Sequence, residues 1–297
     1  MRIVVAGASG LIGNALVPGL RDRGHDVVRL VRRPAAGPDE ISWDPAAGIL
    51  DPASLDGVEA AVNLGGVNLG DKRWSPTFKH EILASRLATT GTLAAALAAL
   101  PEPPRVLVNG SAIGYYGDTG DTEVDEAAPP GEGFLADVVV QWEAATAPAV
   151  AAGIRTVLAR TGLVVAPGAG AFGKLVPIFK LGGGGRLGSG RQYWSFISLT
   201  DEVRALTHLL ERDTFAGAVN LTAPHPVTNA EAVKALGAVL HRPSLLPVPA
   251  FALRAVVGEF AEDILGSARV RPTVLLEAGF AFEHPSIEAA LRAELAA

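Results

Sequence analysis

Residues 3–13 read IVVAGASGLIG, and this stretch decides the fold. An apolar run typical of a buried strand ends in three glycines, Gly7, Gly10 and Gly13, and an apolar-periodic helix follows them. This order leaves several backbone N–H groups pointing at one spot, where the helix dipole also favours an anion. Gly7 allows the tight turn, Gly10 lets a pyrophosphate approach the backbone, and Gly13 lets the helix pack closely on the strand. The stretch therefore favours a dinucleotide-binding unit over a glycine turn without any ligand.

The second strand, predicted over Asp26 to Val31, ends at Arg32-Arg33-Pro34. The dinucleotide fingerprint expects an acidic residue here, which bonds the ribose hydroxyls of NAD and repels the 2′-phosphate of NADP. A guanidinium can instead clamp that phosphate with charge-assisted hydrogen bonds. We therefore predict NADP(H) in preference to NAD(H), with Arg32 and Arg33 as contacts. The alternative is that both arginines are solvated loop charges.

Composition bounds the class of protein. The chain has 297 residues, enough for one large or two modest domains, and 49% hydrophobic with 19% charged residues is a globular composition. A net charge of −6 without a long basic run argues against nucleic-acid and membrane-surface partners. The sequence lacks Cys, and its six His are scattered without ligand spacing, so we expect no metal site. The N-terminus begins with a charged residue and a strand, and we expect a soluble cytoplasmic protein.

Strand and helix patterns alternate over residues 1 to about 160, which predicts an α/β fold: a Rossmann-type doubly wound parallel sheet with ligands at the carboxyl ends of its strands. A strand at 60–64 runs into Gly65-Gly66, where small residues let a backbone approach the cofactor. Further predicted elements are a long helix ending near 100, a strand at 106–109, a helix at 134–153 and a strand at 156–160. Residues 34–56 and 118–133 are predicted as loops.

Beyond residue 165 the composition changes. Residues 168–190 are rich in glycine around an amphipathic stretch at 172–181. We predict a cofactor domain of residues 1–165, to which about 196–222 returns, and a smaller, mostly helical C-terminal substrate lobe of 166–195 and 223–297. Helices are predicted at 201–211, from a capping box at 228–231 to near 241, and at 249–265, 272–278 and 286–296. Arg191, Tyr193 and Trp194 in the glycine-rich region are expected substrate walls, and a plain linker is the alternative.

The motifs GxxGxxG, LGG after the strand at 60, GSAIGYYG, RTGLVV and TDEV occur in the order seen in extended and atypical short-chain dehydrogenase/reductases. More narrowly, DKRWSPTFK, LVPIFKLGGGG, GSGRQYW and LLEAGFAF are similar to the atypical epimerase-family, sugar nucleotide epimerase-like subgroup. The resemblance covers essentially the whole chain. It implies a Rossmann domain that binds NADP(H) and a smaller substrate lobe.

The resemblance and the glycine motif together give a predicted site. The predicted cofactor-binding residues are Gly7, Ser9, Gly10, Leu11, Ile12, Gly13, Arg32, Arg33, Leu64, Gly65, Gly66, Glu81, Arg86, Ser111 and Val164. The predicted substrate contacts are Lys72, Arg73, Trp74, Tyr115, Arg191, Tyr193 and Trp194. Without the resemblance, Glu81 and Arg86 would be ordinary surface charges of a helix.

The chemistry departs from the family pattern. Most members use a Ser, a Tyr and a Lys four residues after the Tyr, and the Lys lowers the pKa of the phenol. Counted back from Glu143, the Tyr and Lys positions are Leu135 and Val139, which cannot transfer a proton. The Ser position aligns on Ala112.

Ser111 and Tyr116 remain as candidate catalytic residues. We expect no cation near Tyr116 and a phenol pKa near ~10, and aromatic packing is the alternative role. Ser198 stands where the subgroup frequently has a histidine, which removes another base.

The leading hypothesis is an NADP(H)-dependent oxidoreductase or epimerase-like enzyme acting on a small polar molecule, with the arginine-rich loop as a clamp if that molecule is anionic. A catalytically inactive NADP(H)-binding sensor or scaffold is the alternative, and a structural role without cofactor comes third. The sequence supports no prediction of the oligomeric state.

Overall fold

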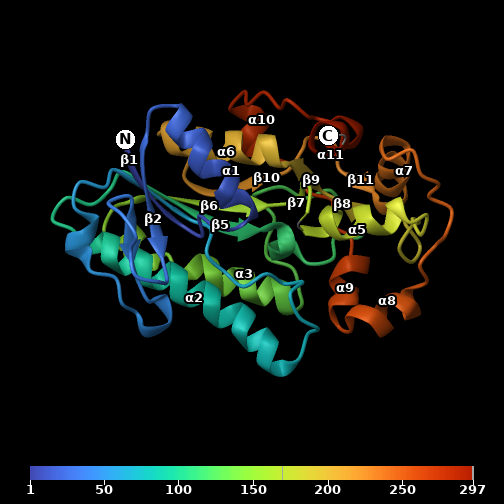
Figure 1. Cartoon of the computed structure of the whole chain (residues 1–297), viewed down its shortest axis with the longest axis horizontal. Helices are drawn as coiled ribbons and strands as arrows, with labels where there is room; N and C mark the ends of the chain where they lie inside the picture. The colour runs from blue at the N-terminus through green and yellow to red at the C-terminus, as the bar shows by residue number, and fades with distance from the viewer. Residues whose placement is uncertain (169, 296–297) are drawn as a thin grey trace.

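The computed structural model describes residues 1–168 and 170–295 (Figure 1). Within these residues the main sheet has seven parallel strands in the order β10-β6-β5-β4-β1-β2-β3. Its order reverses between β1 and β4, which is the switch point where doubly wound sheets bind ligands. The strands are β1 (Arg2–Ala6), β2 (Asp26–Val31), β3 (Glu40–Ser42), β4 (Ala60–Asn63), β5 (Val106–Ala112), β6 (Arg155–Thr161) and β10 (Gly217–Leu221).

Helices cover both faces of this sheet, as Figure 1 shows. On one face lie α1 (Leu11–Asp22), α6 (Leu199–Glu211) and α10 (Thr273–Glu277), whose apolar side chains share one core with β1 and β6. On the other face lie α2 (Pro76–Ala98) and α3 (Phe134–Ala144), as Figure 1 shows, and α4 (Ala147–Ala151), whose Ala149 shares a core with Leu93 of α2. Central strands buried on both faces explain the nearly continuous apolar runs in the sequence. The predicted Rossmann-type α/β fold is confirmed.

The remaining elements gather at the carboxyl end of the sheet. They are β7 (Leu163–Val165), α5 (Gly170–Lys180), β8 (Tyr193–Trp194), β9 (Phe196–Ser198), β11 (Val227–Thr228), α7 (Asn229–Val239), α8 (Ala250–Val257), α9 (Phe260–Leu265) and α11 (Ile287–Leu295). A separate core joins α5, α7 and α11. The capping box of Thr228 and Glu231 begins α7 as predicted. Leu275 of α10 packs in the core of the main sheet, outside the lobe that the sequence assigns to it.

Three local predictions were wrong. Residues 34–56 contain the edge strand β3 and two short 3₁₀ helices, η1 (Pro45–Ala47) and η2 (Pro52–Leu55), where only a loop was expected. The helix predicted at 134–153 divides into α3 and α4, with Pro148 near the start of α4, because a proline cannot continue the hydrogen-bond ladder. The helix predicted at 249–265 divides at Gly258, whose φ of 68° ends α8. The helix predicted at 286–296 reaches a residue outside the described ranges.

In the described ranges, no helix combines the length and the apolar composition needed to cross a membrane.

Candidate functional site

The glycine turn between β1 and α1 has no room for side chains. Gly7 has a φ of +76°, and a Cβ there would lie 2.6 Å from the carbonyl carbon of Leu64. A Cβ on Gly13 would clash with the carbonyl oxygen of Gly7. Gly10 caps α1 in an extended conformation, and none of the described side chains caps this helix. The first-turn N–H groups are therefore available to a phosphate, and the cradle fits the pyrophosphate of a dinucleotide.

The two arginines after β2 have different surroundings. The Arg33 guanidinium makes hydrogen bonds of 2.6 and 2.7 Å to the two carboxylate oxygens of Glu40 on β3. This bidentate contact holds the pKa of Glu40 at about 2. Arg32 is exposed and makes no hydrogen bond or ion pair with the residues that the structure describes. Arg32 is thus available to a phosphate, whereas the Arg33 side chain is already engaged.

Arg86 of α2 is a partly buried cation beside the switch point. Its Nη1 donates to the carbonyl oxygens of Val67 and Ile82, at 3.2 and 3.0 Å. Its guanidinium lies 5.0 Å from the centroid of the Trp142 ring. It also lies against the position that a Cβ on Gly66 would occupy. Burial lowers the pKa of Arg86 to about 10, and it forms no ion pair within the described ranges. A guanidinium without an ion-pair partner can bind an anionic group.

The other predicted cofactor contacts occupy different positions. Gly65 follows β4, and a Cβ there would lie 2.9 Å from the Thr89 side chain, so this backbone packs tightly on α2. Val164 is the central residue of β7. Glu81 pairs with Lys72 at 2.9 Å on the outside of α2. Leu64 continues the β4 backbone and donates its N–H to Ala6. Ser9, Leu11 and Ile12 belong to the glycine turn and to the first turn of α1.

A cavity of about 590 Å³ opens between α3 and α9, and we call it the α3–α9 cavity. Its lining includes strand ends, residues of α3, β8 and residues of α9 in the C-terminal lobe. Aromatic side chains form much of its wall: Trp74, Phe134, Trp142, Tyr193, Trp194 and Phe260. The Trp74 ring stacks on Phe260 with centroids 5.0 Å apart and meets Phe134 edge-on at 5.2 Å. These three rings join the sheet domain to the C-terminal lobe.

The positions that the sequence assigns to the family Tyr and Lys lie on this wall. Leu135 and Val139 both line the α3–α9 cavity, and so does Ala112 at the end of β5. Leu135 and Val139 are four residues apart, so they share one face of α3. That face carries no group that can donate a proton.

Ser111 and Tyr116, the predicted catalytic residues, lie in a buried polar network instead. Ser111 donates to Glu143 at 2.6 Å, and Glu143 pairs with the buried Arg160 at 2.8 Å. Arg160 donates to the Tyr116 hydroxyl at 3.0 Å, and this hydroxyl donates to Asn220 at 2.8 Å. None of these five residues is among the described residues that line the α3–α9 cavity. The side chains of Ser111 and Tyr116 are therefore already hydrogen-bonded within the protein.

The expectation that Tyr116 has no nearby cation was wrong. The Arg160 guanidinium lies 3.4 Å from the centroid of the Tyr115 ring as well as bonding Tyr116. Burial nevertheless raises the pKa of Tyr116, and the hydrogen bond from Arg160 offsets this only in part. Tyr116 is therefore poorly suited to proton transfer at neutral pH.

The predicted substrate contacts divide by chemistry. Trp74, Tyr193 and Trp194 line the α3–α9 cavity. The basic residues do not: Lys72 pairs with Glu81, and the Arg73 guanidinium donates to the carbonyl oxygen of Ala255 at 3.1 Å. Arg191 is exposed, and neither it nor Tyr115 is among the described lining residues. The structure thus brings three of the four predicted aromatic contacts to the cavity wall, whereas Tyr115 and the predicted basic contacts are not among its described lining residues.

Sequence reasoning missed the carboxylates of the cavity. The lining contains Asp118, Glu132, Glu259, Glu262 and Asp263. The last three follow helical i, i+3 and i+4 spacing on α9, a pattern that usually marks a solvated face. Burial, the largest effect, raises the pKa of Asp263 to about 6, although the side chain keeps an exposed side at the cavity mouth.

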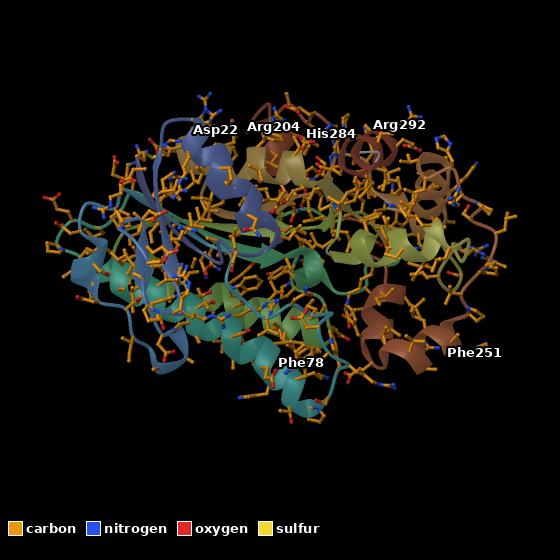
Figure 2. All side chains as sticks on the ribbon, viewed as in Figure 1. Asp22, Phe78, Arg204, Phe251, His284 and Arg292 are labelled. Carbon is orange, nitrogen blue, oxygen red and sulfur yellow. The ribbon has the colours of Figure 1, made fainter. Side chains whose placement is uncertain are left out.

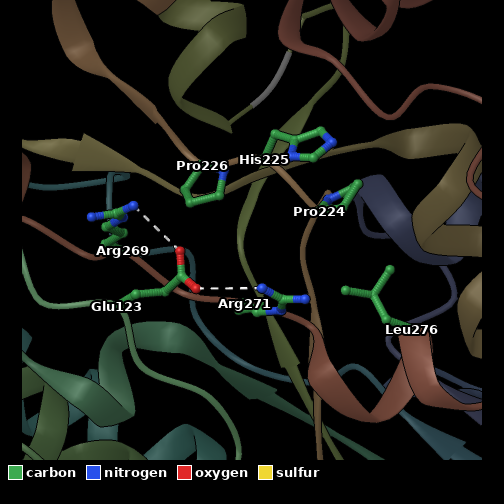
Figure 3. Close-up of a pocket in the computed structure, with 7 residues that line it drawn as sticks. All are labelled: Glu123, Pro224, His225, Pro226, Arg269, Arg271 and Leu276. Carbon is green, nitrogen blue, oxygen red and sulfur yellow. Dashed lines mark ion pairs between the residues drawn. The ribbon is translucent and has the colours of Figure 1, made fainter.

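A second, smaller cavity of about 460 Å³ is lined by residues of other segments: Glu123, Pro224, His225, Pro226, Arg269, Arg271 and Leu276 (Figure 3). There Glu123 faces both Arg269 and Arg271, at 3.5 and 3.6 Å, with His225 nearby. Among the described residues, no three His, Asp or Glu side chains are placed to hold a metal ion.

Comparison with known proteins agrees with this geometry. The model of the NAD dependent epimerase/dehydratase family matches residues 3–221, and a domain of unknown function, DUF1731, matches residues 248–294. An epimerase family protein of Mycobacterium bovis is 48% identical over 290 residues, which is 97% of this chain and 96% of that protein.

Solved structures are similar over the whole chain. The crystal structure of human epimerase family protein SDR39U1 with NADPH is 37% identical, with a TM-score of 0.89 and 99% of each chain covered. A nucleoside-diphosphate sugar epimerase from Corynebacterium glutamicum is 31% identical, with a TM-score of 0.83, and covers 100% of this chain and 58% of that chain.

Proposed function

Because the chain belongs to the NAD dependent epimerase/dehydratase family, we propose that it is an NADP(H)-dependent oxidoreductase whose small-molecule substrate enters the α3–α9 cavity. The glycine turn carries the proposal, since a Cβ on Gly7 would clash with the backbone of Leu64 and a Cβ on Gly13 with the backbone of Gly7 and Ala8, so only glycines allow the tight strand–turn–helix arrangement that presents N–H groups to a pyrophosphate. Arg86 is the second support, because a partly buried guanidinium without a carboxylate partner in the described chain suits an anionic or polar part of a dinucleotide.

Two observations support NADP(H) over NAD(H). Arg32 is exposed and unengaged by the described residues at the end of β2, where a 2′-phosphate would lie. A human relative of similar structure has been solved with NADPH. Arg33 contributes indirectly, because its contact with Glu40 ties β3 to the loop that carries Arg32.

A binding titration tests the cofactor preference. We expect Arg32→Ala to weaken NADPH binding roughly 10- to 100-fold, as for loss of a charge-assisted phosphate contact, and to leave NADH binding unchanged. Arg212→Ala is the matched control, because Arg212 is also an exposed arginine and lies beyond the end of α6. NADPH fluorescence gives both dissociation constants. Equal NADPH affinity in the wild type and Arg32→Ala would refute the phosphate contact.

When bound, NADPH supplies a hydride, and the chain provides the place where the acceptor is held. Trp142 positions Arg86 through its ring and donates its own N–H to Thr90 at 2.9 Å. The aromatic wall of the α3–α9 cavity would exclude water around a bound substrate.

A catalytically inactive NADP(H)-binding sensor is the second candidate. The observation that favours it is the engagement of Ser111 and Tyr116 in the buried network with Arg160. NADPH oxidation measured against a panel of carbonyl and imine compounds separates the two. Tight NADPH binding without turnover of any compound supports the sensor, and turnover that a Val139→Trp variant blocks supports the enzyme.

A further inference from the structure

The wall of the α3–α9 cavity has an excess of negative charge. Its lining contains five carboxylates and one cation, Arg86. Two of the carboxylates have a cationic partner: Glu259 pairs with Lys79, and Glu262 pairs with Arg254 at 2.7 Å. Five carboxylates thus face three cations even when these partners are included. A nucleoside diphosphate would bring further negative charge to this wall and be repelled by it.

The uncompensated charge comes from three residues. Asp263 and Glu132 make no side-chain hydrogen bond or ion pair within residues 1–168 and 170–295. Asp118 accepts only backbone N–H groups, from Gly120 at 2.9 Å and Ser267 at 3.2 Å. These carboxylates come from both sides of the cavity, α9 and the segments flanking α3, so a cation inside would face more than one of them.

Aromatic walls and carboxylates together favour organic cations. The faces of Trp and Tyr rings attract a cation, and the nearby carboxylates add Coulomb attraction in a partly desolvated space. The cavity already shows this preference, since Arg86 lies over Trp142. An uncharged polar substrate would gain little from either feature.

The face of α3 that carries the positions assigned to the family Tyr and Lys is apolar. Reduction of a ketone needs a hydride at carbon and a proton at oxygen, and Leu135 and Val139 cannot give that proton. An iminium ion already carries its positive charge and needs only the hydride. A substrate of this class removes the need for the missing acid.

We propose that the α3–α9 cavity takes an apolar iminium ion and that the protein reduces it to the amine. A C–H bond forms at the iminium carbon, and the C=N π electrons become the lone pair of the nitrogen. The substrate gains two electrons, NADPH is oxidised to NADP⁺, and no proton is consumed. This inference rests on the proposed function, since it uses NADPH as the reductant.

Binding is measured first, on the protein loaded with NADP⁺, where no reduction can occur. The probes are N-methyl-3,4-dihydroisoquinolinium, the uncharged 1-tetralone of similar shape, and UDP-glucose. Trp74, Trp142 and Trp194 line the cavity, so quenching of tryptophan fluorescence reports occupancy. We expect the iminium salt to bind at least tenfold more tightly than 1-tetralone, and UDP-glucose to bind more weakly than both.

Neutral variants test the wall. Asp263→Asn and Glu132→Gln should each weaken iminium binding about three- to tenfold and leave 1-tetralone binding unchanged. The matched control is Asp22→Asn on α1, an exposed carboxylate far from α9, where the same loss of charge should have no effect (Figure 2). Because these three side chains are exposed, the variants should fold.

The outcomes are separable. Equal or tighter binding of 1-tetralone, tighter binding of UDP-glucose, or no binding by any probe would overturn the inference, as would iminium binding without NADPH oxidation. Failure to bind NADP(H) would overturn the proposed function, and the same titrations on the protein without cofactor would still decide the charge preference. Tight iminium binding with formation of the N-methyl amine supports both.

Discussion

Replacement of Glu202 by glutamine should stabilise the protein at neutral pH but not at pH 4.5. Glu202 lies in the first turn of α6 with no exposed surface, and its Oε1 accepts a hydrogen bond of 2.8 Å from Thr161. Its Oε2 has no partner among the described residues. Burial raises the pKa of Glu202 to about 8, and the Thr161 hydroxyl counters this only partly.

The sign follows from linkage. The unfolded chain loses the Glu202 proton above about pH 4.5, whereas the folded protein keeps it until about pH 8. Glu202 therefore costs nothing below pH 4.5, and its destabilising effect grows as the pH rises through this window and then becomes constant. At pH 7 the cost is about 3 kcal/mol, at roughly 1.4 kcal/mol for each pH unit above 4.5. Glutamine keeps the acceptor for Thr161 and has no charge to bury.

Urea unfolding at pH 4.5, 6, 7 and 8 measures this. We expect wild type and Glu202→Gln to agree within about 1 kcal/mol at pH 4.5 and to differ by about 3 kcal/mol at pH 7, a rise in Tm of about 5 °C for a chain of this length. Thr161→Val is the companion variant: it removes the only side-chain donor to Glu202 in the described structure, raises the folded pKa of Glu202 further and should extend the loss of stability to pH values above 8. A stability difference that stays constant across the pH series would refute the burial argument.

Three further predictions concern the cradle, the buried network and the aromatic wall. Gly13→Ala should abolish NADPH binding in a fluorescence titration, because its Cβ has no room. The control is Gly91→Ala, where a Cβ meets nothing within 4 Å. This variant should keep NADPH binding and add about 0.5–1 kcal/mol to the free energy of unfolding in urea. Glu143→Gln should lower the free energy of unfolding by about 3–5 kcal/mol, because it leaves the buried Arg160 guanidinium unpaired. Tyr116→Phe should lower it by only about 1–2 kcal/mol. Equal losses for the two variants in chemical denaturation would contradict the ion-pair account. Phe260→Ala should weaken binding of any aromatic cavity ligand at least tenfold in fluorescence quenching while NADPH affinity stays the same, and a parallel loss of NADPH affinity would show that the lobe had moved.

The sequence predicted the sheet domain well because local signals and the fold agree there. The apolar run, the glycines and the helix after them are contiguous, so the first βαβ unit needed no long-range information. β3 was missed because its three residues lie between Pro, Gly and Asp residues and are held by pairing with β2, which no local pattern encodes. Pro148 and Gly258 are evident in the sequence, but neither was predicted to divide a helix.

The candidate site was predicted less completely for a physical reason. Ser111 and Tyr116 looked reactive because only their own strand was considered, whereas Arg160 and Glu143 arrive from β6 and α3. The same applies to Arg33, whose carboxylate partner sits on the unpredicted β3. The carboxylates of α9 were not singled out from the sequence, because only the packing of Phe260 on Trp74 shows that this helix closes the cavity.

The packing of α3 holds this helix in place without a Tyr and a Lys on its cavity face. Leu135, Val139 and Trp142 follow helical spacing along one side of α3, and all three line the cavity. Trp142 fixes the helix by its hydrogen bond to Thr90 and its contact with Arg86, so the position of α3 does not depend on a Tyr and a Lys being present. With an apolar face held there, polar chemistry must come from other parts of the cavity wall. Three of the five carboxylates lie at α9, within the separately matched residues 248–294, whereas Asp118 and Glu132 precede α3. Substrate recognition is therefore expected to follow α9 rather than the sheet domain.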